Sequence, residues 1–142
     1  MNKILFFKIN RIKKITQMKS RSEAFLKEAQ NKLKIAKEEM FKPAEDIVSY
    51  SICKNSQFAI ENYLKGFLAT KEEVLLNSDE TIASLYNKCV AIDKDFETVE
   101  MGTIGCKNHP IDSRYCSEIN SVSACFDTAD NIDTYLKKNN II

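Results

Sequence analysis

The stretch Ser51–Leu68, SICKNSQFAIENYLKGFL, decides the fold of this 142-residue chain. It reads as the middle of a long helix, because apolar residues recur at helical spacing around much of its circumference. A helix of that kind is usually central in a bundle. Polar side chains stand between the apolar ones, and Gln57, Glu61 and Lys65 follow one another at four-residue steps on one face. The stretch therefore bears on both fold and function.

The composition favours long helices. Only three glycines and two prolines occur, and 29% of the residues are charged, which suits helices better than a turn-rich β fold. No apolar run approaches the roughly 20 residues that a membrane-spanning helix needs. The five cysteines include no CxxC pair, and three of them fall on predicted apolar helix faces. We therefore expect reduced thiols in a cytoplasmic protein rather than a disulfide framework.

Charge is distributed unevenly along the chain. Residues 1–19 hold six basic residues and no acid, whereas the remaining 15 basic residues are outnumbered by 20 acids. This acidic body lacks the basic surplus of a strong nucleic-acid binder. We interpret residues 1–17 as a basic extension, either disordered or a start-site artefact that precedes a true start at Met18. A tail for RNA or for a membrane surface is the alternative, although we expect no membrane partner. Residues 18–142 form the predicted helical domain.

Four helices are predicted along the chain. The first begins at a capping box, Ser20–Glu23, and the second begins just after Pro43, which suits a first helical turn. Residues 93–114 contain two glycines and a proline and show no sustained period. The lengths and the short first connection predict an antiparallel up-and-down four-helix bundle. The first three helices are expected at about Ser20–Met40, Ala44–Ala69 and Thr81–Ile92. The fourth follows Arg114, with a core stripe from Ile119 to Leu136.

The central stretch also resembles a known family. Gln57–Gly66, QFAIENYLKG, resembles the Q-x-A-x-E-K-x-L-K-A signature on the second helix of HEPN domains. Thr81–Leu85 resembles the family's Ser/Thr-L-x-x-L opening of helix 3, Arg114–Cys116 its R-Y-P turn, and Val122–Ala129 its Ala/Val register. The resemblance implies a small all-α bundle that usually dimerises. Many such proteins pair with a minimal nucleotidyltransferase in toxin–antitoxin systems, and others are metal-independent ribonucleases.

The family's ribonuclease motif is missing here. In those members an R-x(4–6)-H pair activates the ribose 2′-hydroxyl and stabilises the charge on the phosphorane. The only histidine in this chain is His109, and it precedes Arg114 instead of following an arginine at that spacing. We therefore predict no catalytic residues. An atypical ribonuclease or RNA-binding toxin that uses His109 and Arg114 is the alternative.

No metal or cofactor is predicted. Cys106, His109 and Cys116 could supply three zinc ligands, with Cys125 as a distant fourth, but structural zinc sites commonly use paired short spacings. No glycine-rich loop opens a helix in the way that a phosphate loop requires.

Gln57, Glu61 and Lys65 are the candidate binding residues, on a face that would line a groove or dimer seam. Tyr115 is the further candidate, at the border of that groove. Glu61 and Lys65 have the favourable order for a helical ion pair of about 0.2–0.5 kcal/mol, which is the structural interpretation. The functional interpretation is a polar ridge that contacts a partner protein or a nucleotide-like ligand. We predict a non-catalytic interaction module that binds a nucleotidyltransferase. We also predict a homodimer, because Phe58 and Phe67 do not share one face with the other apolar residues of their helix.

Overall fold

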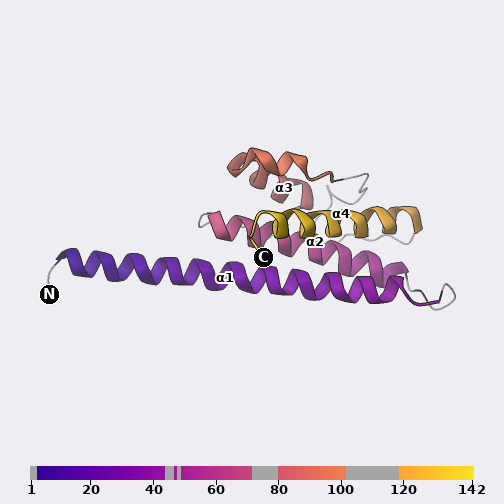
Figure 1. Cartoon of the computed structure of the whole chain (residues 1–142), viewed down its shortest axis with the longest axis horizontal. Coiled ribbons are helices and arrows are strands. Elements are labelled where there is room, and N and C mark those ends of the chain that lie inside the picture. The colour runs from indigo at the N-terminus through magenta and orange to yellow at the C-terminus, as the bar shows by residue number, and fades with distance from the viewer. Residues whose placement is uncertain (1–2, 44–46, 48, 72–79, 102–118) are drawn as a thin grey trace.

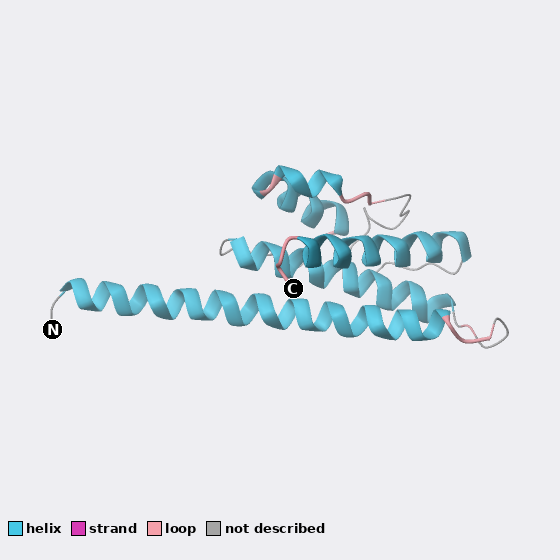
Figure 2. Cartoon of the chain, viewed as in Figure 1, coloured by secondary structure: helices cyan, strands magenta, loops and turns pink. Residues whose placement is uncertain are grey.

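The computed structural model describes residues 3–43, 47, 49–71, 80–101 and 119–142. Within these ranges the regular structure is entirely helical, which confirms the predicted all-α class (Figures 1 and 2). The elements are α1 (Lys3–Met40), α2 (Ser49–Lys71), α3 (Ile82–Ile92), the 3-10 helix η2 (Lys94–Thr98) and α4 (Ile119–Lys138).

α1 runs unbroken through the position where we predicted a helix to begin, so the prediction of a start at Ser20 is wrong. No glycine or proline interrupts residues 3–40. Nearby hydroxyls bond back into the helix: Thr16 Oγ1 donates to the Ile12 carbonyl at 2.9 Å, and Ser22 Oγ donates to the Lys19 carbonyl at 3.2 Å. On both sides of Ser20, hydroxyls thus bond to carbonyls of a continuous helix. The 38 residues of α1 span about 57 Å at 1.5 Å per residue.

α2 begins later than predicted. Ile47 lies outside the helix, which starts at Ser49 rather than near Ala44. Ile47 packs instead against a small cluster of Ile52, Cys53 and Val122, so its burial is obtained without helical backbone. Residues 44–46 lie outside the described ranges.

α1 and α2 form an antiparallel pair. Leu26 of α1 lies against Gly66 of α2, so close that a Cβ at position 66 would stand 2.6 Å from Leu26 Cδ2. Further along, Lys32 of α1 lies over the ring of Phe58 at 5.7 Å. As α1 advances along the chain, its contacts on α2 therefore move backwards. Glycine at position 66 allows the two helices to cross at short range.

α4 runs parallel to α2. α3 packs against a different side of α2 (Figure 1). Ile52 and Cys53 near the start of α2 meet Val122 near the start of α4, whereas Tyr63 further along α2 bonds Asp133 further along α4. The Cys89 thiol of α3 lies 3.6 Å from the Leu64 carbonyl of α2. α2 is therefore enclosed by three other helices, as its apolar circumference predicts.

The burial of α2 removes the reason given for a homodimer. Phe67 is 1% exposed and Phe58 is half-buried against α1, so the breadth of apolar cover on α2 is satisfied within one chain. The homodimer stays a prediction without that support.

The segment after α3 adds a core residue that its lack of periodicity concealed. Phe96 in η2 is fully buried. Its ring centroid lies 4.7 Å from that of Phe67 and 5.0 Å from that of Tyr135, with Tyr86 at 5.9 Å. Aromatic pairs at such spacings contribute about 0.5–1.5 kcal/mol beyond area burial. This aromatic cluster joins η2 to α2, α3 and α4.

Candidate functional site

The three predicted binding residues on α2 differ sharply in exposure. Gln57 is 1% exposed and donates from Nε2 to Cys53 Sγ at 2.8 Å. Glu61 and Lys65 form an ion pair of 2.7 Å between Nζ and Oε1, with side chains 10% and 20% exposed. The helical ion pair is therefore confirmed, and Lys65 is the member of the three that reaches solvent most. Tyr115, His109 and Arg114 lie outside the described residues, as do Cys106 and Cys116.

Two buried side-chain oxygens of α2 lack a hydrogen-bond partner among the described residues. Gln57 Oε1 and Ser56 Oγ are both buried and accept no hydrogen bond there. Leaving a buried acceptor unsatisfied costs about 1–3 kcal/mol. Such groups commonly bond to ordered water or a bound group in native proteins. The buried end of the polar face is thus an energetically costly position, which an all-apolar helix would avoid.

A second charged pair, which the sequence pattern does not predict, joins Glu80 to Lys88 of α3. Glu80 precedes the helix, is 4% exposed and pairs with Lys88, whose side chain is 36% exposed. Ser84 Oγ also donates to Glu80, while its oxygen accepts from the backbone N–H of Thr81 at 2.8 Å as part of a capping box. The eight-residue separation of Glu80 and Lys88 hides the pair from an i,i+4 search.

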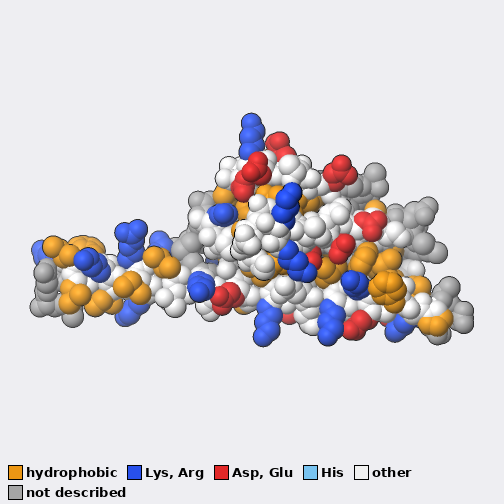
Figure 3. Space-filling model, viewed as in Figure 1, with side chains coloured by type: hydrophobic (Ala, Val, Ile, Leu, Met, Phe, Trp, Pro, Cys, Tyr) orange, Lys and Arg blue, Asp and Glu red, His pale blue; other side chains and the backbone are white. Residues whose placement is uncertain are grey.

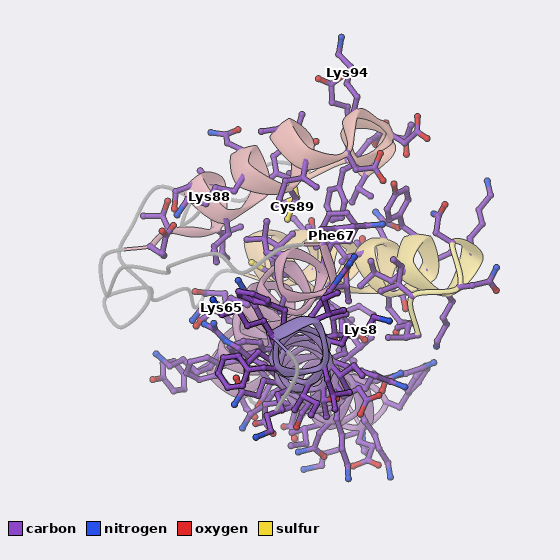
Figure 4. The ribbon with its side chains drawn as sticks, turned by 90° about the vertical axis from the view of Figure 1, so that its left-hand side faces the viewer. Lys8, Lys65, Phe67, Lys88, Cys89 and Lys94 are labelled. Atoms are coloured by element: carbon purple, nitrogen blue, oxygen red, sulfur yellow. The ribbon has the colours of Figure 1, made fainter. Side chains whose placement is uncertain are left out.

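The two charged pairs lie on the same side of the molecule. Lys65 and Lys88 are each the chain neighbour of a residue in the Leu64–Cys89 contact between α2 and α3. Figure 4 shows both lysines on the same side of the ribbon. We call Glu61, Lys65, Glu80, Ser84 and Lys88 the α2–α3 charged strip. Its carboxylates are buried beneath its more exposed ammonium groups.

The strip is suited to recognition rather than to covalent chemistry. Both carboxylates are paired with lysines, so neither is poised as a general base, and Ser84 donates to a carboxylate instead of to a histidine. The described residues hold no cluster of three potential metal ligands. What the strip offers a partner is two partly exposed ammonium groups on a helical face, each of them held in position by a buried acid.

A polar triad of two buried residues, Tyr63 and Asp133, and the exposed Lys137 lies on the α1, α2 and α4 side of the bundle. Tyr63 Oη donates to Asp133 Oδ1 at 2.6 Å, and Lys137 Nζ lies 2.7 Å from Asp133 Oδ2. Burial, followed by the hydrogen bond and charge of Asp133, raises the pKa of Tyr63 well above its usual range. The phenol therefore stays protonated and keeps its role as donor. This triad connects α2 to α4, and Lys137 is its exposed member.

The cysteines of the described helices are structural. Cys53, Cys89 and Cys125 are all buried, as expected for thiols on apolar faces. Burial raises the pKa of Cys89 to about 12, so it carries no thiolate at neutral pH. A nucleophilic cysteine needs a lowered pKa and access to solvent, and Cys89 has neither.

Comparisons with known proteins give no relative. No protein-family model matches the chain, and neither a curated protein nor a solved structure matches it. Within the described ranges, no helix is both long and apolar enough to span a bilayer.

Proposed function

We propose that this chain is a non-catalytic interaction module of HEPN type that binds a partner protein through the α2–α3 charged strip. The carrying observation is the placement of Lys65 and Lys88 on neighbouring helices, each partly exposed above a buried carboxylate. Lysines held in this way lose less side-chain freedom on binding than mobile surface lysines do. They present a fixed pattern of positive charge to an acidic surface.

The fold of the proposal is the antiparallel up-and-down bundle predicted from the sequence. The antiparallel α1–α2 pair and the parallel α2–α4 pair support that topology. The signature residues Gln57, Glu61 and Lys65 all belong to α2, the helix that the resemblance assigns them to. A homodimer, a cytoplasmic location and a nucleotidyltransferase partner are parts of the same proposal.

The partner is tested by copurification. We expect a small nucleotidyltransferase to be encoded beside the gene and to copurify with the tagged chain. Lys65→Gln with Lys88→Gln should weaken this binding by about tenfold or more, at roughly 1.4 kcal/mol per factor of ten. Lys27→Gln with Lys34→Gln is the matched control, because these exposed lysines belong to α1, which contributes no residue to the strip. Thermal unfolding of both variants verifies that they remain folded. Equal binding by the two variants would remove the strip from the interface.

The absence of catalysis is tested in cells. We expect induced expression of the chain to leave cellular RNA intact. Growth arrest with RNA degradation that disappears in His109→Ala would overturn the non-catalytic assignment and favour the atypical ribonuclease. A nucleotide-like ligand is the third possibility. Saturable binding of ATP to the purified chain, lost in the Lys65→Gln and Lys88→Gln variant, would replace the protein partner with a ligand.

A further inference from the structure

The first part of α1 exposes an unusual number of large apolar side chains. We call Lys3–Gln17 the N-terminal arm. All of its residues are exposed, and α1 extends beyond the end of the α2–α4 body at this end (Figure 1). The arm accounts for seven of the ten exposed large hydrophobic residues among those described, with exposures of 38% to 68%: Ile4, Leu5, Phe6, Phe7, Ile9, Ile12 and Ile15.

The same arm is strongly basic. It holds five basic residues and no acid, whereas the rest of the chain has an excess of acid. The space-filling view shows this directly, with blue and orange side chains and no red ones toward the N-terminal end of α1 (Figure 3). Positive charge at this end of the helix also opposes the helix dipole, because the first turn contains no acid. An external anionic surface would offset both the repulsion among these basic residues and their unfavourable interaction with the helix dipole.

Apolar and basic residues are partly segregated around the arm. At about 100° per residue, Ile4, Ile15, Ile12, Leu5 and Ile9 fall within a sector of about 140°. Lys3, Lys13 and Lys14 lie on the opposite side, together with Asn10 and Gln17, and Phe6 and Phe7 also fall outside the apolar sector. Lys8 falls inside the apolar sector, where a long aliphatic stem allows the ammonium group to reach past it. Basic amphipathic helices of this kind lie in the interface of anionic membranes.

A second copy of the chain fits the arm less well. Two arms side by side would bring ten positive charges together without any acid between them. Away from the arm, the exposed large hydrophobics of the described residues are Ile35, Phe41 and Tyr50, which are too few to cover seven. An anionic lipid surface satisfies both the charge and the apolar area.

We propose that the N-terminal arm binds the surface of membranes that contain anionic lipids, lying in the interface with its apolar sector toward the acyl chains. From the sequence we expected no membrane partner. The exposure of seven apolar side chains on the arm, five of them within one sector, changes that expectation. The proposal goes beyond the partner-binding module and does not depend on it. Membrane binding would also stabilise the arm, because a helical segment of about 15 residues without packing is marginal in water.

The test is cosedimentation of the full chain with vesicles. We expect binding to phosphatidylcholine vesicles that contain phosphatidylglycerol, little binding to phosphatidylcholine alone, and a loss of binding as salt is raised. Replacing Leu5, Ile9 and Ile12 with glutamine should abolish sedimentation with the anionic vesicles. The matched control, Ile35→Gln with Phe41→Gln, removes exposed apolar groups from the other end of α1 and should bind like the parent.

A second pair of variants tests the charge. Arg11→Gln with Lys13→Gln should weaken partitioning by roughly thirtyfold, given the attraction of each basic residue near an anionic surface. Lys27→Gln with Lys34→Gln removes the same charge from the packed half of α1 and should change it far less. All four positions are exposed, and unfolding curves should be unchanged.

Three results would overturn the proposal. Equal binding to neutral and anionic vesicles would show that charge does not drive the binding. Equal effects of the arm and control variants would show that the arm is not the binding site. The third is failure to bind either vesicle, whatever else the arm then binds. Arm-dependent dimers in sedimentation equilibrium would then assign it to a second copy, and an arm-dependent gel shift of RNA would assign it to nucleic acid.

Discussion

The two halves of α1 belong to one helix but have opposite environments. In the half that follows Ser22, the buried positions Leu26, Ala29, Leu33 and Ala36 recur at three- and four-residue steps against α2 and α4. Continued backwards, the same register reaches Met18, Ile15, Arg11, Lys8 and Ile4, where basic residues interrupt the apolar ones. Helical backbone alone does not distinguish the halves. What distinguishes them is whether another helix lies alongside.

The largest expected contrast is a matched truncation in each half. Leu26→Ala should lower the free energy of unfolding by about 2–5 kcal/mol, because it empties a buried site at the α1–α2 crossing. Ile12→Ala should change it by about 0.5 kcal/mol or less, because Ile12 is 63% exposed. Urea unfolding measures both. Similar losses in the two variants would mean that the arm packs against the body in solution.

A second prediction concerns the short crossing itself. Gly66→Ala should destabilise the fold by about 1–3 kcal/mol through overpacking, reduced by the roughly 1 kcal/mol that alanine gains in helix propensity. The new methyl group would meet Leu26 Cγ at 2.7 Å and the Leu26 backbone nitrogen at 3.3 Å. In a Leu26→Ala background the cost of Gly66→Ala should shrink, as a double-mutant cycle would show. If the costs of Gly66→Ala and Leu26→Ala simply add, the new methyl group does not clash with the Leu26 side chain.

A third prediction tests the buried hydrogen bond between Tyr63 and Asp133, which holds α2 to α4. Tyr63→Phe should cost about 1–2 kcal/mol, because Asp133 loses the hydroxyl that donates to it in a buried setting. Tyr50→Phe is the control, since Tyr50 is 47% exposed and belongs to the same helix. Thermal unfolding compares the two. A Tyr63→Phe variant as stable as the parent would show that Lys137 alone satisfies Asp133.

The smallest effect concerns pH. Burial raises the pKa of Cys89 from its ordinary 9.0 to about 12, so the folded chain holds this proton where the unfolded chain has released it. Stability from this group is complete below pH 9 and falls as the pH rises toward 12. The loss at pH 10 is on the order of 1 kcal/mol. Cys89→Ala should flatten the alkaline decline in urea midpoint, whereas an unchanged decline would assign it to Tyr63 and the other tyrosines.

The sequence predicted the helices whose faces are regular. Thr81 caps α3 as its Ser/Thr-L-x-x-L pattern implies, and the predicted core stripe from Ile119 to Leu136 lies within α4. The errors arose where local signals compete with context. Ser20–Glu23 matches the capping-box pattern, yet the helix is not interrupted before it, because the preceding residues are equally able to form helix.

Two features of the site and core had no readable signal. Phe96 is buried by three aromatic neighbours from other segments. The periodicity of a single segment does not predict such contacts. Lys88 is paired with a residue that precedes its helix, so a search along one helix misses it. Glu61 and Lys65 could be paired from their spacing alone, because a four-residue step on a helix fixes the geometry. The burial of Gln57 depends on neighbouring helices, which a sequence pattern does not contain.

The parallel arrangement of α2 and α4 has a consequence for the order of folding. The α1–α2 pair is close in sequence and can close a short loop early, whereas the bond between Tyr63 and Asp133 joins residues 70 positions apart. Contacts at long sequence separation slow the search for the native topology. We expect the docking of α4 to be the late step, with Ile132→Val raising the unfolding rate and leaving the folding rate nearly unchanged in stopped-flow kinetics. A slowed folding rate would place α4 in the nucleus instead.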